Sequence, residues 1–139
     1  MSSSGNIPKL LVIRDDPGGR LRPRLQLVSD LRDQQTRVEF RGRYCNSSCT
    51  LLLGVEDVCV SPRTRFGFHG PHYLDRPIPE ERFEYWSQRM ADAYPPRLRG
   101  WFMSTARYRG AVPITLTGAQ LIKMGFARCP KGTGTTTTR

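Results

Sequence analysis

The stretch Cys45-Asn46-Ser47-Ser48-Cys49-Thr50-Leu51-Leu52-Leu53-Gly54 (CNSSCTLLLG) is the part of the chain that decides the predicted fold. Three polar residues precede a short apolar run, which is typical of the entry to a buried helix, and Gly54 stands near its end. The residues before it, 36–44, include the alternation of a strand at Val38 and Phe40. We therefore expect a strand, a turn at the serines and a buried helix.

Outward from this turn, the sequence predicts alternating strands and helices. The expected strands cover residues 9–14, 36–44, 57–60, 64–69 and 113–116, and the expected helices cover residues 20–34, about 83–93, 97–108 and 117–125. This alternation favours an α/β fold with mostly parallel strands. We expect one domain over residues 9–129, a flexible N-terminus over residues 1–8 and a disordered polar tail over residues 130–139.

The net charge of +10 and the pI of about 10.2 are compatible with a nucleic acid or an anionic membrane as partner. The basic residues are, however, mostly arginines scattered along the chain, so a solvated surface is favoured over a nucleic-acid interface. No apolar run approaches the roughly 18 residues that span a bilayer. Residues 1–16 also lack the pattern of a signal peptide, so we expect either a cytosolic chain or a form without its targeting segment.

The four cysteines are Cys45, Cys49, Cys59 and Cys129. No pair has the Cys-x-x-Cys spacing of a zinc or redox site, and the two histidines are not placed around them as in a zinc knuckle, so we expect no metal and no cofactor. Two interpretations stay open at this point. The cysteines form two disulfides, with three possible connectivities and an oxidising compartment implied, or they are small buried thiols.

Three features together indicate a catalytic site. Adjacent glycines at Gly18-Gly19 allow a bend that brings backbone N–H groups close to a ligand oxygen. Ser47 stands at a strand-to-helix junction, where a nucleophile is exposed, and His69 ends a strand and is a base near neutral pH. Each feature also has a plain structural explanation: the glycines form only a turn, the serine caps the helix, and His69 packs in the core or a loop. The second histidine, His72, could equally be exposed and without a role.

The order and spacing of these segments resemble the Clp-protease family of the crotonase superfamily. The shared segments are residues 15–19 (DDPGG), 45–48 (CNSS) with the apolar helix behind it, Pro62, 67–71 (GFHGP) and 116–126, so the likeness covers about residues 9–129. The chain is still more similar to a bacterial branch of Clp-like proteins, usually exported, that carries C-x-S-A-C-T and G-F-H. The resemblance implies a compact spiral core of mostly parallel strands with flanking helices.

Carried onto this sequence, the resemblance makes Ser47 the nucleophile and His69 the base. The backbone N–H of Ser48 and the Gly18-Gly19 turn would then stabilise the oxyanion, each donor contributing about 3 kcal/mol. The chain departs from the family where an Asp orients the histidine, because residues 111–114 (AVPI) hold no carboxylate. Either a dyad acts alone or a carboxylate such as Asp75 reaches the histidine. The chain also begins later than an active core of this family usually does.

Several functions follow as alternatives. The first is a serine hydrolase, such as a peptidase, acting on a peptide or acyl substrate, with export to the periplasm implied by the resemblance. The second is an inactive module of the same fold used for interaction or assembly, and in both cases a homo-oligomer is expected. Nucleic-acid binding is a third, disfavoured function. An acyl-CoA function is a minor alternative, because no feature of the sequence is recognised as binding the adenine of CoA.

Overall fold

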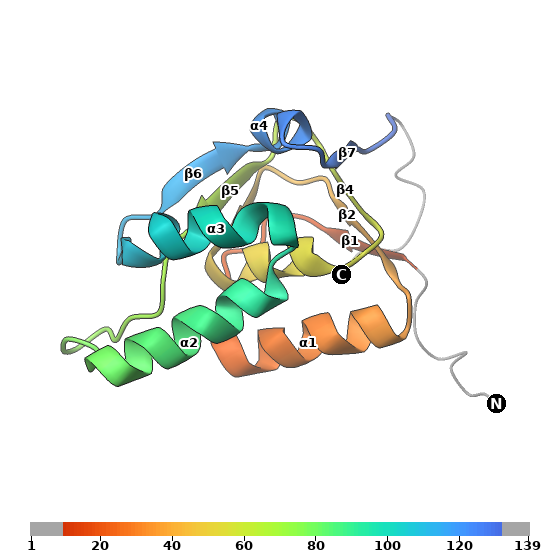
Figure 1. Ribbon diagram of the computed structural model, residues 1–139. Helices are drawn as coiled ribbons and strands as arrows, with labels where there is room; N and C mark the ends of the chain where they lie inside the picture. Colours follow the sequence, from red (N-terminus) through yellow and green to blue (C-terminus); the bar gives the residue numbers. More distant parts are fainter. Residues whose placement is uncertain (1–9, 132–139) are drawn as a thin grey trace.

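Two small sheets and the helices that cover them make up an α/β fold (Figure 1). The computed structural model describes residues 10–131, so the predicted flexible N-terminus and most of the predicted tail lie outside the described residues. The strands are β1 (Leu10–Ile13), β2 (Arg37–Phe40), β3 (Tyr44–Asn46), β4 (Val58–Val60), β5 (Arg65–Phe68), β6 (Ile114–Thr117) and β7 (Ala127–Arg128). The helices are α1 (Leu21–Asp33), α2 (Glu80–Ala93), α3 (Pro96–Ser104) and α4 (Gly118–Lys123), with 3₁₀ helices η2 (Ser47–Gly54) and η3 (Ala106–Tyr108).

The first sheet has the order β1-β2-β4-β7, and all of its neighbouring strands are parallel. The second sheet has the order β3-β5-β6, in which β3 runs parallel to β5 and β6 runs antiparallel to it. The predicted α/β class with mostly parallel strands is therefore confirmed. The strand β7 was not predicted, since its two residues, both exposed, carry no apolar alternation.

The strand predicted over residues 36–44 is wrong as a single element. The chain forms β2 in the first sheet, bends at Gly42, and enters the second sheet as β3. A Cβ placed on Gly42 would lie 2.5 Å from the backbone nitrogen of Asp15, so the bend needs a residue without a side chain. The bend matters because it places Ser47, just after β3, at the end of the second sheet.

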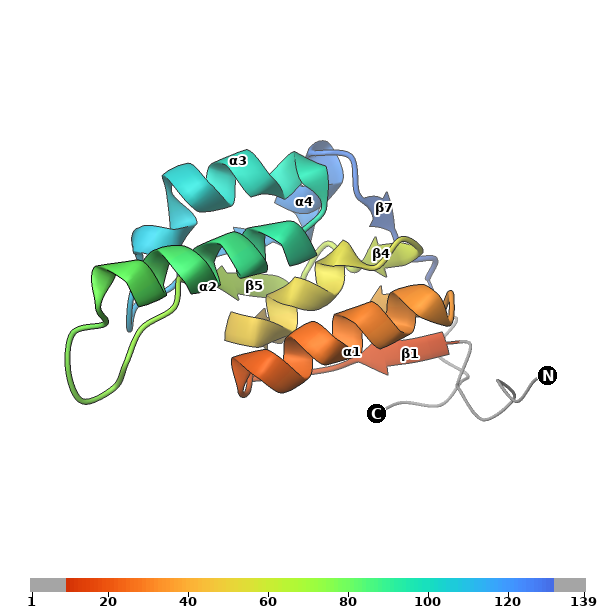
Figure 2. The same cartoon turned by 60° about the horizontal axis from the view of Figure 1, so that its bottom comes forward.

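The helix predicted after the serines is present as η2, and it is the centre of the core. Leu51, Leu52 and Leu53 are all fully buried, and η2 packs against α1, α2, β3 and β5. A helix that is buried on every side must be apolar all round, which explains the unbroken leucine run. Each buried leucine contributes about 2 kcal/mol. Turned forward, the molecule shows this helix between α1 and α2 (Figure 2).

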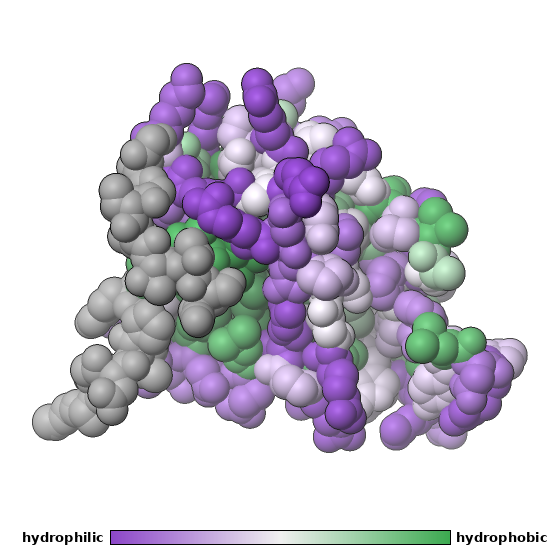
Figure 3. Space-filling model, turned by 180° about the vertical axis from the view of Figure 1, so that it is seen from behind, coloured by the Kyte–Doolittle hydropathy of each residue, from purple (hydrophilic) through white to green (hydrophobic). Residues whose placement is uncertain are grey.

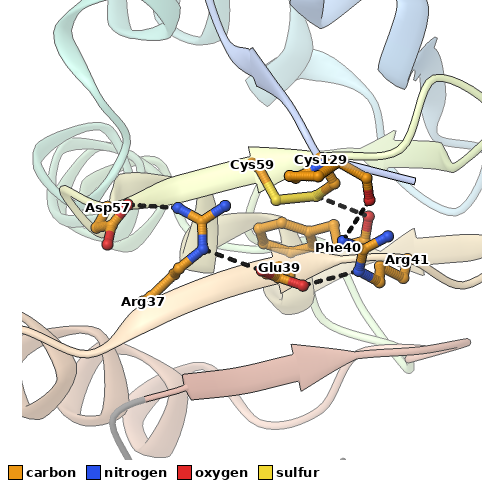
Figure 4. Close-up of polar contacts among 8 residues, drawn as sticks. Arg37, Glu39, Phe40, Arg41, Asp57, Cys59 and Cys129 are labelled. Carbon is orange, nitrogen blue, oxygen red and sulfur yellow. Dashed lines mark hydrogen bonds and ion pairs between the residues drawn. A yellow bond between two sulfur atoms is a disulfide. The ribbon is translucent and has the colours of Figure 1, made fainter. Parts of the chain in front are cut away.

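The face opposite α1, α2 and α3 carries hydrophilic side chains along its whole height (Figure 3). On β2, Glu39 accepts hydrogen bonds from Arg37 at 3.0 Å and from Arg41 at 2.7 Å (Figure 4). Burial alone would raise the pKa of Glu39, but the bonds from Arg41 and Arg37 outweigh it and hold this pKa below its ordinary value. These ion pairs cover the outer face of β2, and we assign them a structural role.

Both pairs of cysteines form disulfides, which resolves the alternatives that the sequence left open. Cys45 is bonded to Cys49 across the turn that holds Ser47, and Cys59 of β4 is bonded to Cys129 just after β7 (Figure 4). The first bridge closes a short local loop. The second ties the last strand of the first sheet to its neighbour.

Candidate active site

The turn after β1 is held beside β3 by backbone hydrogen bonds. Asp16 donates its N–H to the carbonyl of Tyr44 at 3.1 Å and accepts from the N–H of Asn46 at 2.9 Å. The Asp16 carboxylate accepts from the N–H of Gly18 and from Arg24, each at 2.9 Å. These bonds bring the Gly18-Gly19 turn to the junction where Ser47 lies, although Gly19 and Ser48 are 29 residues apart in the sequence.

The same turn is bonded directly to the serine pair. The hydroxyl of Ser48 accepts from the N–H of Gly19 at 2.8 Å and donates to the carbonyl of Gly19 at 2.9 Å, across a sequence separation of 29 residues. A Cβ on Gly18 would lie 2.6 Å from the Cβ of Ser47, so the glycine backbone packs directly against the nucleophile candidate. Gly18 itself has φ +107, a conformation that residues with a side chain rarely adopt.

Ser47 stands in an unusual backbone conformation at the first residue of η2. Its φ is +58, which places a non-glycine residue in the left-handed region, a feature that recurs where a side chain is held out for function. The turn is held from below by a buried chain of hydroxyls. Thr50 donates to the Ser47 carbonyl at 2.7 Å, and since that uses its one proton, Tyr94 donates to Thr50 at 2.6 Å. The Cys45–Cys49 disulfide encloses the same residue.

His69 follows β5, and its ring is oriented by a backbone carbonyl. Its Nδ1 lies 2.9 Å from the carbonyl oxygen of Gly70, and His72 Nδ1 lies 3.2 Å from the same oxygen. A carbonyl oxygen only accepts, so Nδ1 of His69 carries the proton in the neutral ring and Nε2 is left as the basic atom. Burial lowers the pKa of His69, the Gly70 carbonyl works against this, and the neighbouring His72 lowers it further.

Ser47 and His69 line one cavity of about 370 Å³. Its walls come from four places: the start of α1, the start of η2, the loop after β5 and one face of α2. The lining residues are Gly19, Arg20, Leu21, Arg22, Pro23, Ser47, Ser48, His69, Gly70, Pro71, His72, Tyr73, Trp86 and Met90. Within the described residues, the Ser47 hydroxyl and the His69 ring share the cavity without a hydrogen bond between them.

Two of the predicted oxyanion donors already have partners. The Gly18 N–H is bonded to the Asp16 carboxylate and the Gly19 N–H to the Ser48 hydroxyl. The Ser48 N–H differs, because Ser48 is the second residue of η2 and the first N–H groups of a helix have no partner inside it. Among the three predicted donors, the amide of Ser48 is thus the one best placed to meet a developing negative charge.

Asp75, the carboxylate named from the sequence as a candidate orienting group, is bonded to Arg76 at 3.2 Å. Among residues 10–131, no ion pair joins a carboxylate to His69. The orienting contact that the ring does have is the carbonyl of Gly70.

Several cavity residues were missed in the sequence. The sequence leaves open that His72 is exposed and idle; in the structure it is half-buried, and its ring centroid lies 4.9 Å from that of His69. Trp86 and Met90 carry no predicted role in the site, and the structure places both on the cavity wall. One sequence feature could have predicted this position. The two residues are four apart, so they share one face of a helix, and that helix follows the loop that begins at His69.

Two features concern the other partners considered from the sequence: the pairing of the arginines bears on nucleic-acid binding, and the length of the helices bears on membrane spanning. Several arginines are paired with carboxylates, among them Arg24, Arg37 and Arg43, so part of the positive charge is balanced inside the molecule. None of the helices described is both long and apolar enough to cross a membrane. Nor do residues 10–131 contain a group of three or more His, Cys, Asp or Glu side chains arranged to hold a metal ion.

No protein-family model matches the chain, and no curated protein matches it either. The functional conclusion therefore depends on the geometry of the cavity and on the motifs in the sequence.

Proposed function

We propose that the protein is a Clp-like serine hydrolase that forms an acyl-enzyme at Ser47, with His69 as general base. The observation that carries the proposal is that a serine with φ +58 at the start of a buried helix and a half-buried histidine line the same cavity. A hydroxyl becomes a useful nucleophile only when a base takes its proton, and a cavity is where an acyl group would be held. The fold proposed with it is the Clp/crotonase core.

The chemical steps follow the ordinary course of acyl transfer. Nε2 of His69 takes the proton of the Ser47 hydroxyl while Oγ bonds to the substrate carbonyl carbon, and the carbonyl electrons move to its oxygen. The imidazolium then gives the proton to the leaving group as the carbonyl forms again. Water repeats the sequence on the acyl-enzyme and frees the acid. The lowered pKa keeps His69 neutral, and so able to accept a proton, at pH 7.

The Ser48 amide is the proposed first donor to the tetrahedral oxyanion. In the structure the Gly19 amide donates its hydrogen bond to the Ser48 hydroxyl. It becomes a second donor to the oxyanion when the substrate oxygen displaces that hydroxyl. The Gly70 carbonyl replaces the carboxylate that orients histidine in a triad. A neutral carbonyl fixes the tautomer but stabilises the imidazolium less than a carboxylate does, so a modest turnover is expected.

The direct test is labelling with a fluorophosphonate followed by peptide mapping. We expect one covalent adduct, on Ser47 rather than on Ser48, whose hydroxyl is engaged with Gly19. The Ser47→Ala variant should not be labelled. A folded protein that never reacts, or one that reacts at scattered serines, would contradict the hydrolase proposal.

Gly18→Ala should damage the site while leaving the distant core intact. The new Cβ would lie 2.6 Å from Ser47 Cβ and 2.9 Å from the Asn46 carbonyl, at a φ of +107 that alanine avoids. We expect a loss of about 1–3 kcal/mol in the free energy of unfolding and at least a tenfold slower labelling of Ser47.

Gly100→Ala is the matched control for this substitution. Gly100 lies inside α3, and a Cβ there meets no atom within 4 Å. Because alanine favours a helix, the control should gain up to about 1 kcal/mol and label at the normal rate. Equal behaviour of the two variants in chemical denaturation and labelling would mean that the Gly18 turn does not position Ser47.

The alternative is an inactive module of the same fold, used for interaction or assembly. Within residues 10–131, no hydrogen bond joins Ser47 to His69 and no carboxylate is paired with the His69 ring, and both findings favour the inactive module. Fluorophosphonate labelling separates the two, because the inactive module has no activated serine. The two disulfides support an oxidising compartment under either function.

A further inference from the structure

We propose that the cavity binds an acyl group that is apolar along its length and carries a negatively charged group, so that the substrates are esters or amides of such acids. The inference rests on the proposed function of Ser47 and names the substrate class of the same site. Two observations carry it: the apolar wall of the cavity and the sign of the charges around it.

One wall of the cavity is apolar. Trp86 and Met90, four residues apart on α2, both line the cavity, and Met90 is 4% exposed. Pro71 and Tyr73 add to this surface from the loop after β5. An indole, a thioether and a proline ring offer dispersion contacts but few polar groups, so this wall suits methylene or aromatic groups.

The charged residues that line the cavity are all basic. They are Arg20 and Arg22 at the start of α1; the rings of His69 and His72 also line the cavity, and no Asp or Glu is among the lining residues. The Arg22 guanidinium lies 5.0 Å from the centroid of the Trp86 ring, which fixes a positive charge at the edge of the apolar wall. The helices α1 and α2, which carry these two residues, are in contact.

The guanidinium groups of Arg20 and Arg22 are available to pair with an anionic ligand. Within residues 10–131, neither Arg20 nor Arg22 forms an ion pair with a carboxylate, whereas Arg24, the next arginine on α1, is bonded to Asp16 at 2.9 Å. A guanidinium forms two parallel hydrogen bonds with a carboxylate, and its attraction is stronger beside a low-dielectric wall than in open water. A neutral acyl chain would contact the apolar wall but leave both guanidinium groups without an anionic partner.

The test compares matched p-nitrophenyl esters: the hexanoate with the adipate monoester, which adds a terminal carboxylate, and the pentanoate and octanoate with the glutarate and suberate monoesters. We expect kcat/KM to be about fivefold to tenfold higher for the anionic ester of the best-fitting pair at low ionic strength, and the ratio to fall with added salt. The Arg20→Gln/Arg22→Gln variant should bring that ratio close to one.

Arg89→Gln is the control, because Arg89 also lies over an aromatic ring of α2, 5.2 Å from the centroid of Tyr85, but outside this cavity. It should keep the preference for the anionic ester. The inference is overturned if neutral and anionic esters of every length react equally, or if Arg89→Gln removes the preference as fully as the double variant.

A binding measurement separates this inference from the proposed function. In Ser47→Ala, calorimetry with the N-phenyl amides of hexanoic acid and of adipic acid needs no hydrolysis. Tighter binding of the adipic compound, lost in Arg20→Gln/Arg22→Gln, supports the inference even where Ser47 proves unreactive. Equal binding of the two amides overturns it even where Ser47 is labelled and the proposed function stands.

Discussion

His69→Ala should lower kcat/KM for an activated ester by about 10²- to 10⁴-fold while the protein stays folded. The reason is that Ser47 then has no base to take its proton, and the Ser48 amide can stabilise an oxyanion only after the hydroxyl has attacked. His69 is half-buried, and the hydrogen bond that its ring forms within residues 10–131 is to the adjacent Gly70 carbonyl, so its loss should cost little stability. The measurement is steady-state hydrolysis, with the circular dichroism spectrum as a check of folding.

His72→Ala is the matched control for that experiment. The two rings line the same cavity, and both place Nδ1 against the Gly70 carbonyl. If His69 is the base, His72→Ala should slow the reaction less than tenfold. If His72→Ala lowers kcat/KM more than His69→Ala does, the base is His72, and our assignment of His69 is wrong.

Removal of the Cys59–Cys129 disulfide should have the largest effect on stability. This bridge spans a sequence separation of 70 residues, for which loop-closure entropy predicts a contribution of about 4 kcal/mol. It also holds β7, a strand of two exposed residues at the edge of the first sheet that pairs with β4. We expect Cys59→Ala/Cys129→Ala to lower the free energy of unfolding by about that amount, measured by chemical denaturation.

The Cys45–Cys49 bridge provides the comparison within the same chain. It spans a separation of only 4 residues, so the same entropy argument gives about 2 kcal/mol. Because it encloses Ser47, its removal should slow fluorophosphonate labelling more than removal of Cys59–Cys129 does. An equal loss of stability from both bridges, with no difference in labelling, would contradict the positioning role of the short loop.

Local patterns in the sequence predicted most elements of the fold. The apolar run at Leu51–Leu53 predicted a buried helix because only a fully enclosed helix tolerates three leucines in a row. The break of residues 36–44 into β2 and β3 was missed, since it depends on the approach of the Asp15 backbone to Gly42, a contact between distant segments. The pairing of the cysteines was open for the same reason.

The candidate site was predictable in part. Ser47, His69 and the Gly18-Gly19 turn carry recognisable motifs, and the structure brings all of them to one cavity or its border. The engagement of the Gly19 amide by the Ser48 hydroxyl had no signal in the sequence, because it joins segments 29 residues apart. The wall formed by Trp86 depends on how α2 returns over η2, which no local pattern specifies.

The central claim is that the His69 imidazole is the base that activates Ser47, and the pH dependence of Ser47 labelling tests it most directly. A histidine acts as a base only when neutral, so the rate should rise with pH and become constant above the pKa of His69. Since burial lowers that pKa, the midpoint should lie below the ordinary value of 6.5, coincide with the His69 titration seen by NMR, and be absent in His69→Ala. A rate that keeps rising through pH 9 without a plateau, and is the same in His69→Ala, would contradict the account.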